Sequence, residues 1–393
     1  MRKGLIILIL MMAIAFKADA EGLFIQQPAD TLRQATLQEV PIYLVDYNLL
    51  PVLGYSSDFG LFGGLLLQRH RLSDFPYPMV TVTELDLRAS LDGNVLGDLT
   101  HERSMFFGRE IHTTYHLRGV RHKESKFFGL GNDTQFSRSR FDDGYYGVEE
   151  RSLHFGFDAR IPMLEYGNYG RLTGVLTSNI SYNQPVSRQD ESVFAIEEPT
   201  GVDGGWVNQL GVGLRLVSKD DPLIPELGYH LEARWLTSQS WLASNYAFDH
   251  LKFELRGYLS PFSRLVVAQK VELQVASGNT PFWEMPRLGH GEGLRGYALN
   301  RFRGERSILH ILEIRSWIAQ FYDGELRLGG QLFMDTGRVF AGGGESNRVF
   351  DELRQTFGIG GAVHLPASNF LLRADLGFSE EMTRIYVGLG YLF

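Results

Sequence analysis

The chain has 393 residues, carries 38 Lys and Arg against 46 Asp and Glu for a formal net charge of −8, and has no cysteine. An acidic chain is a poor candidate for nucleic-acid binding, which depends on basic surface. The lack of cysteine excludes disulfides, thiolate metal sites, cysteine nucleophiles and an N-terminus lipidated at cysteine.

The first twenty residues, MRKGLIILILMMAIAFKADA, have the pattern of a secretory signal peptide. A basic start at Arg2 and Lys3 precedes an apolar run, and Ala18 to Ala20 provide a small-residue cleavage site. The apolar run is shorter than the roughly 20 residues that a spanning helix needs, which disfavours the alternative of an N-terminal membrane anchor. We therefore predict that residues 1–20 are removed on export.

Much of the remaining chain alternates between apolar and polar residues with a period of two. The segment DHLKFELRGYL (249–259) sets four apolar residues against charged or polar ones, and GELRLGGQLFMD (324–335) and FLLRADLGF (370–378) follow the same pattern. Period two indicates β-strands, and long strands with one apolar and one charged face are typical of transmembrane β-barrels. A soluble all-β sandwich is the alternative, but its strands are usually shorter.

Strand counting points to a barrel of about 16 strands. Fifteen strands can be read between about residues 57 and 393, and bacterial single-chain barrels have even strand numbers. The missing strand is best placed at 40–54, where Pro41 and Pro51 indicate an irregular edge. Most long connections fall on one side, as in barrels whose long loops face outward. We predict an all-β, transmembrane antiparallel β-barrel whose segments are a signal peptide (1–20), a lead that can include the first strand (21–52) and the barrel (53–393).

A glycine-rich, basic stretch, GHGEGLRGYALNRFRGER (289–306), interrupts the alternation. If the turn near residue 323 pairs Glu313 with Phe333, Asp335 lies diagonally beside Glu313 on the inner face. An arginine fork suits such a partly buried carboxylate pair better than lysine does. We predict that loop 278–305 folds into the lumen with Arg295 near both carboxylates. The alternative is a solvated basic loop.

Several motifs in this region resemble the BamA/TamA family of outer-membrane assembly and translocation barrels, also called bacterial surface-antigen barrels. LRGY (294–297) resembles the signature of the family's sixth external loop, LEIR (312–315) its Glu-bearing strand, and LFMDTGRVF (332–340) its Phe-x-Asp-x-Gly strand. YVGLGYLF (386–393) is similar to the C-terminal insertion signal of outer-membrane barrels, with Tyr391 and Phe393 ending the closing strand. The resemblance implies a loop motif (Leu294, Arg295, Gly296, Tyr297), barrel-wall partners (Glu313, Phe333, Asp335, Gly337) and an insertion signal (Tyr386, Gly388, Tyr391, Phe393).

The resemblance also implies a function and a place in the cell. We expect a bacterial outer-membrane insertase or translocation pore for protein or lipid, with outer-membrane lipid and the assembly machinery that inserts it as partners. Members of this family usually carry periplasmic POTRA domains before the barrel, and the segment between Ala20 and the first strand is too short for one. We therefore expect a separate periplasmic partner. A passive or gated diffusion channel and a structural surface protein are the alternatives.

The sequence motifs do not favour an enzyme over a barrel without catalytic residues. The chain has 11 histidines but no Gly-x-Ser-x-Gly elbow. Aromatic residues such as Trp235 and Trp317 fit an interface girdle or lumen packing better than a ligand platform. We predict no catalytic residues, no metal, no cofactor and no nucleic-acid partner.

Overall fold

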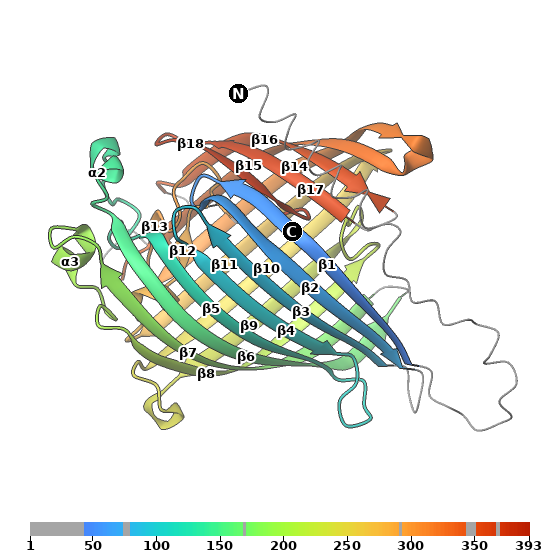
Figure 1. Cartoon of the computed structure of the whole chain (residues 1–393), viewed down its shortest axis with the longest axis horizontal. Coiled ribbons are helices and arrows are strands. Elements are labelled where there is room, and N and C mark those ends of the chain that lie inside the picture. The colour runs from blue at the N-terminus through green and yellow to red at the C-terminus, as the bar shows by residue number, and fades with distance from the viewer. Residues whose placement is uncertain (1–42, 74–78, 168–169, 291–292, 343–350, 367–369) are drawn as a thin grey trace, which may run out of the picture. The chain divides into compact units, whose positions relative to one another are not determined.

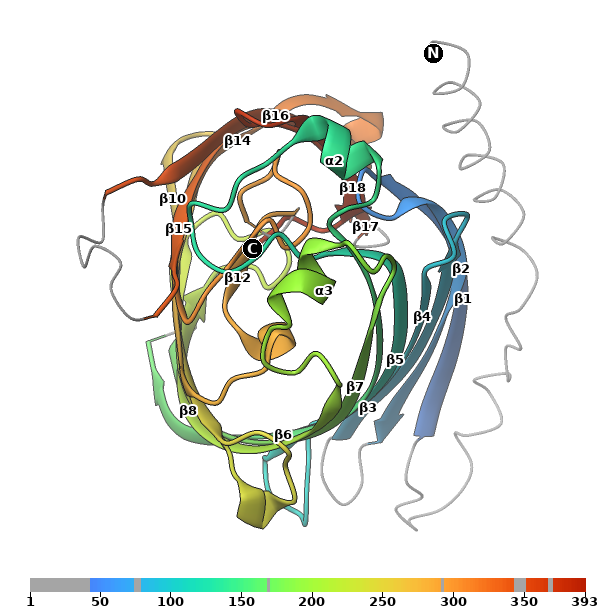
Figure 2. The same cartoon turned by 90° about the vertical axis from the view of Figure 1, so that its left-hand side faces the viewer.

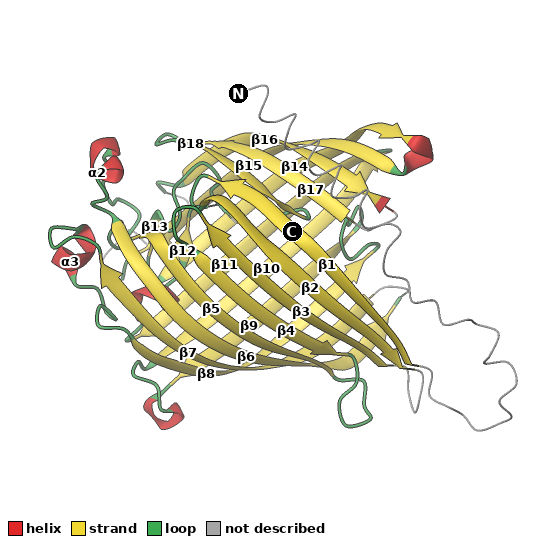
Figure 3. Ribbon diagram, viewed as in Figure 1, coloured by secondary structure: helices red, strands yellow, loops and turns green. Residues whose placement is uncertain are grey.

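The computed structural model describes residues 43–73, 79–167, 170–290, 293–342, 351–366 and 370–393. These residues form a closed antiparallel barrel of 16 strands (Figures 1 and 3), which confirms the predicted fold class and strand number. The predicted signal peptide (1–20) and the lead up to residue 42 lie outside the described residues.

Barrel strands follow one another around the wall in chain order, except that β14 follows β11. Their bounds are β1 (Tyr43–Ser56), β2 (Gly60–Ser73), β3 (Met79–Ser90), β4 (Val95–Arg103), β5 (His112–Lys126), β6 (Gly147–Tyr166), β7 (Gly170–Ser187), β8 (Gly205–Lys219), β9 (Gly228–Ser238), β10 (Phe248–Phe262), β11 (Leu265–Gly278), β14 (Arg306–Phe321), β15 (Leu326–Phe340), β16 (Arg354–Leu365), β17 (Phe370–Phe378) and β18 (Thr383–Leu389).

The connections carry the few other elements. A two-stranded ribbon lies between β11 and β14, and short helices occupy several loops. Their bounds are β12 (Arg287–Leu288), β13 (Phe302–Arg303), α2 (Arg138–Asp142), α3 (Val193–Glu197), η1 (Ser240–Leu242), η2 (Phe282–Glu284) and η3 (Tyr322–Gly324). Among the described residues, no helix is long and apolar enough to cross a bilayer.

The first barrel strand lies where the missing strand was expected, across the predicted domain boundary. Strand β1 pairs with β2 along its whole length, from Tyr43 opposite Ser73 to Ser56 opposite Gly60. Among the described residues, the first barrel strand therefore straddles the predicted boundary at residue 53, consistent with a lead that can include it. Pro51 lies within β1, a position that fits a strand with one poorly paired side, because proline cannot donate to a ladder.

Side chains divide between lipid and lumen as the period-two pattern predicts. On the outer face, aliphatic residues pair in succession across five adjacent strands: Ile314, Leu332, Ile359, Leu376 and Ile385. On the inner face of the same region, charged side chains are buried. An apolar belt outside and a polar lining inside are what a barrel in a bilayer requires.

Long connections gather at one end of the barrel. This end carries the loops of α2, α3 and η1 and the connection between β11 and β14, whereas the opposite end has mainly short turns (Figure 1). Long connections on one side of the barrel are what the sequence predicted. At the outer end, aromatic rings from three loops pack into a buried cluster that includes Phe127, Phe128, Tyr146, Phe194, Phe282 and Trp283.

The inside–outside assignment predicts the effect of a charge in the apolar belt. Leu332 is 58% exposed on the outer face near the middle of β15. We expect Leu332→Arg to cost about 2–4 kcal/mol, the cost of arginine near the bilayer midplane. The variant should show less of the folded, heat-modifiable band on a gel.

A matched control places the same charge in the lumen. Thr100 lies on the inner face of β4, two residues from Asp98, to which its hydroxyl donates at 3.4 Å. Thr100→Arg should fold like the unmodified protein. Equal losses for the two variants would contradict the assignment of faces.

Candidate functional site: a plugged lumen beside a weak seam

The Arg295 side chain lies fully buried between three carboxylates of the barrel wall. It belongs to the connection between β11 and β14, hereafter the plug loop (279–290 and 293–305), which runs inside the ring of strands in Figure 2. Its Nε and Nη2 donate to Asp335 of β15 at 2.9 and 2.7 Å. Its Nη1 lies 2.6 Å from Glu313 of β14 and 3.2 Å from Asp375 of β17.

Two arginines of the wall complete a balanced charge cluster. Arg315 lies 2.8 Å from Glu313, and Arg373 lies 3.2 Å from Asp375. We call this cluster the six-charge network; its members are Arg295, Arg315, Arg373, Glu313, Asp335 and Asp375. All six side chains are buried and the formal charges cancel. Burying charges is tolerated when they are paired and hydrogen-bonded in this way.

Electrostatics hold Arg295 firmly in its charged form. Burial by itself would lower the pKa of its guanidinium, but Asp335 and Glu313 outweigh that effect and raise the pKa above its ordinary value. The backbone N–H of Arg295 also donates to Asp335, at 2.9 Å. One carboxylate therefore fixes both the backbone and the side chain of the plug loop at this residue.

The plug loop approaches the wall so closely that both surfaces need glycine. A Cβ on Gly296, whose φ is +106°, would lie 2.9 Å from the backbone of Phe378. A Cβ on Gly377 of β17 would lie 2.7 Å from the backbone of Arg295. Contacts below 3 Å are not sustained by real side chains, so the loop reaches the carboxylates because neither residue has one.

The remaining predicted motif residues surround Arg295. The guanidinium carbon lies 3.4 Å from the centroid of the Phe333 ring, which stacks beneath it. Strands β14 and β15 pair Glu313 with Phe333, the register expected from the turn. Leu294 and Tyr297 are buried against the wall in an apolar cluster with Leu309 of β14 and other residues. Gly337 lies opposite Leu309 on β15.

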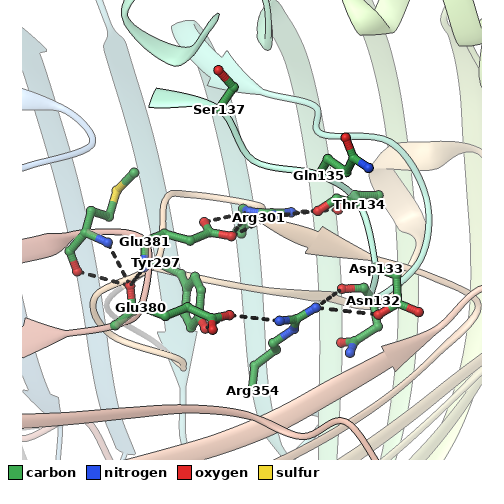
Figure 4. A network of polar contacts seen from close by, with 12 residues as sticks. Asn132, Asp133, Thr134, Gln135, Ser137, Tyr297, Arg301, Arg354, Glu380 and Glu381 are labelled. Atoms are coloured by element: carbon green, nitrogen blue, oxygen red, sulfur yellow. Dashed lines mark hydrogen bonds and ion pairs between the residues drawn. The ribbon is translucent and has the colours of Figure 1, made fainter. Parts of the chain in front are cut away.

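A second set of polar contacts holds the plug loop from the outer side (Figure 4). Arg301 lies between Glu381, 2.7 Å away, and Thr134, whose hydroxyl and carbonyl oxygens each accept at 2.6 Å. Nearby, Glu380 accepts from Tyr297 at 3.2 Å and from Arg354 at 2.8 Å. The turn between β17 and β18 and the loop after β5 therefore both hold the plug loop.

The barrel closes through a weak seam between its first and last strands. Among the described residues, β1 and β18 share one register pair, Ser56 with Tyr386. The next residue, Ser57, donates its N–H to Ile385 at 3.1 Å and accepts from the Ile385 N–H at 3.0 Å through its hydroxyl. By contrast, β17 pairs with β18 over seven residues. The seam side of β1 from Tyr43 to Tyr55 has no ladder partner in this part of the chain.

The C-terminal residues correct one sequence expectation. Strand β18 ends at Leu389, and Gly390 turns the chain with φ +74°. Tyr391 and Phe393 do not continue the closing strand; Arg315 lies over both rings and donates to the Phe393 carbonyl at 3.1 Å. The chain end therefore lies inside the ring (Figure 2), because a lumen arginine offers it a hydrogen bond and a stacking surface.

The other two residues of the predicted insertion signal lie on β18. The Tyr386 hydroxyl faces the plug loop, accepting from the Gly296 N–H and donating to the Tyr297 carbonyl, both at 3.3 Å. A Cβ on Gly388 would meet nothing within 4 Å. Tyr386 thus links the seam strand to the plug loop.

Sequence reasoning missed several residues that the structure brings to this site. Asp375 lies on β17, two strands from Asp335 on β15, so its place beside Arg295 could not be assigned without the registers of the strands between them. Arg301 lies outside the LRGY motif, yet its side chain is only 2% exposed. Asp58 and Arg384, which bond at 2.8 Å across the seam, become neighbours only when the barrel closes.

One pair of histidines has a spacing found in metal sites, but its backbone geometry does not bring the two side chains together. His112 and His116 have His-x-x-x-His spacing but lie on strand β5, where residues four apart are separated by about 13 Å. Within the described ranges, no group of three or more His, Asp and Glu side chains could hold a metal ion.

Arg295 and Asp335 should behave as one unit when either is removed. Breaking a buried ion pair leaves the partner charge uncompensated, at a cost of about 3–5 kcal/mol. We expect Arg295→Ala and Asp335→Ala each to lower the melting temperature and to expose the plug loop to trypsin. The double variant should be little worse than either, because both remove the same interaction.

A control within the plug loop separates this contact from general loop damage. Asn279 is exposed, and Asn279→Ala should leave both readouts unchanged. Additive losses in the double variant, or trypsin cleavage after Arg295 itself in the unmodified protein, would contradict the buried ion pair. Arg295→Lys should not rescue, because lysine lacks the fork that reaches several carboxylates.

Comparison with known proteins places the barrel. Residues 86–393, more than half of the chain, match the Omp85 superfamily domain. Among solved structures, BamA from Haemophilus ducreyi lacking POTRA domains 1–3 is similar with a TM-score of 0.60 and 13% identity, over 88% of this chain and 70% of that one. CdiB from Escherichia coli is similar with a TM-score of 0.55 and 11% identity, over 87% of this chain and 63% of that one. CdiB from Acinetobacter baumannii is similar with a TM-score of 0.52 and 10% identity, over 90% of this chain and 60% of that one.

At such low identities the structural matches establish the fold, and this chain spans less than two thirds of each CdiB chain. No curated protein matches the sequence. The domain match and the similarity in fold confirm the resemblance inferred from the motifs. The chain belongs to the Omp85 superfamily.

Proposed function

We propose that this barrel inserts proteins into the outer membrane, or translocates them, by opening its seam. The observation that carries the proposal is the single register pair between β1 and β18. Every other neighbouring pair of barrel strands shares seven or more register pairs. The seam is therefore where the wall separates with the fewest hydrogen bonds broken.

The free side of β1 supplies a recognition surface. In hydrocarbon, each unpaired backbone N–H or C=O costs several kcal/mol, so an unpaired strand edge strongly favours a partner. An incoming polypeptide in extended form can pair with such an edge by strand addition. A lipid has no backbone ladder to offer, so among the substrates considered the edge favours protein.

The plug loop argues against a permanently open pore. It fills part of the lumen and is fixed by the six-charge network, while the outer loops pack over their aromatic cluster. Passive diffusion would need this material to move, whereas lateral opening at the seam leaves the six-charge network intact. In this proposal a separate periplasmic partner delivers the substrate to the barrel.

Locking the seam tests the proposal. The chain has no native cysteine, so Ser57→Cys with Ile385→Cys can form one defined disulfide across the seam. In lipid vesicles, the reduced barrel should accelerate folding of a urea-unfolded eight-stranded outer-membrane protein, followed as a heat-modifiable band. The oxidised barrel should fall to the rate of empty vesicles, and reductant should restore it.

A matched disulfide away from the seam serves as control. Ile314→Cys with Leu332→Cys joins the outer faces of β14 and β15, which are already fully paired. It should not change the rate. Full activity of the seam-locked barrel would refute lateral opening, and steady passage of small sugars through the locked barrel would instead favour a diffusion channel.

We also propose that the C-terminal motif acts as the chain's own insertion signal. Deleting Phe393 should lower the amount of barrel in the outer membrane and leave exported protein in the periplasm. Leu392→Ala alters the neighbouring side chain, which packs less deeply, and should have a small effect. Equal and mild losses for both changes would assign Phe393 to lumen packing alone.

A further inference from the structure

The plug loop contacts both sides of the seam at its outer end, and one buried carboxylate joins them. Asp58 lies in the turn between β1 and β2, and its side chain is 4% exposed. It accepts from Arg384 of β18 at 2.8 Å. It also accepts from the plug loop, from His290 Nδ1 at 2.7 Å and from the Leu299 N–H at 3.0 Å.

Neighbouring contacts reinforce this arrangement. Arg384 donates to the Ser57 carbonyl at 2.7 Å, so the same guanidinium contacts two successive residues of the β1–β2 turn. The His290 ring meets Phe59 of that turn edge-on at 5.3 Å and Tyr386 of β18 at 5.4 Å. The plug loop therefore lies across the seam, and Asp58 joins the β1–β2 turn, strand β18 and the plug loop.

The chemistry of Asp58 makes the three elements interdependent. Burial by itself would raise the pKa of this carboxyl, but His290 and Arg384 outweigh that effect and hold the pKa below its ordinary value. A buried charge must keep its partners, because an unpaired one is strongly disfavoured. If the seam opens, Asp58 loses Arg384; if the plug loop moves away, it loses His290 and the Leu299 N–H.

We propose that Asp58 is a positioning residue that couples the plug loop to the seam, so that seam opening and release of the outer part of the plug loop occur together. Coupling of this kind is a property of the barrel itself; its use in substrate insertion rests on the proposed function. The six-charge network holds the loop at Arg295, between His290 and Leu299 in the chain, which confines the coupled movement to the segments on either side of Arg295.

The test measures both motions in the same variants without any substrate. Spin labels at Leu53→Cys and Leu389→Cys, which lie on the outer face of β1 and β18, report seam separation. Trypsin added from the outer side reports exposure of the plug loop. We expect Asp58→Asn to increase the separated seam population and the cleavage rate together, by at least about fivefold, the lower end of usual coupling factors.

The control variant is Asp92→Asn, which removes an exposed carboxylate from the neighbouring outer turn. It should change neither readout. Arg384→Gln removes the seam partner but keeps the plug-loop donors of Asp58, so it provides a second variant if Asp58→Asn folds poorly. It should shift both readouts in the same direction as Asp58→Asn does.

Two outcomes would overturn the proposal. A seam that separates in Asp58→Asn while trypsin cleavage stays unchanged would show that seam and plug loop move independently. Equal behaviour of Asp58→Asn and Asp92→Asn would show that Asp58 does not couple the plug loop to the seam. The seam-disulfide test can fail separately from this one. If the seam and the plug loop move together, but the barrel with a locked seam still assembles protein, the coupling through Asp58 would stand and the proposed function would be refuted.

Discussion

The arrangement of this barrel depends on the neutral cluster of three arginines and three carboxylates in its lumen. A loop of about this length could remain in solvent, where its backbone would be fully hydrated. It enters the lumen because Arg295 meets carboxylates already fixed on strands β14, β15 and β17. The wall supplies more negative than positive charge at this point until the loop arrives. Loop and wall are therefore electrostatic complements, and neither is well satisfied alone.

How much of this could be read from the sequence depended on the distance along the chain. Period two and a single turn placed Glu313 opposite Phe333, because strands β14 and β15 are joined by a short connection. Asp375 lies two strands from Asp335, and Asp58 meets Arg384 only across the barrel closure. Such pairs require the registers of all intervening strands, and an error of one residue would reverse every face.

The C-terminal residues show a different limit of pattern reading. The alternation of YVGLGYLF continues to Phe393, so the sequence favours one uninterrupted strand. In the structure, Gly390 has a left-handed φ and the following aromatic residues bind Arg315 instead of the edge of β1. A competing tertiary contact thus overrides local strand preference, as is common where packing and propensity disagree. As a consequence, most of the edge of β1 that faces the seam has no strand partner among the described residues.

Strong and weak parts of the wall lie close together, and the plug loop spans them. At Arg295 the loop is tied to strands that share full ladders, so this point of the loop is held by a rigid support. A few residues away, at His290 and Leu299, it meets the seam, where the ladder is a single pair. Because the weak side has few backbone bonds of its own, contacts through Asp58 make up a large share of what closes it. The plug loop is thereby tied to the rigid part of the wall at Arg295 and to the seam through Asp58.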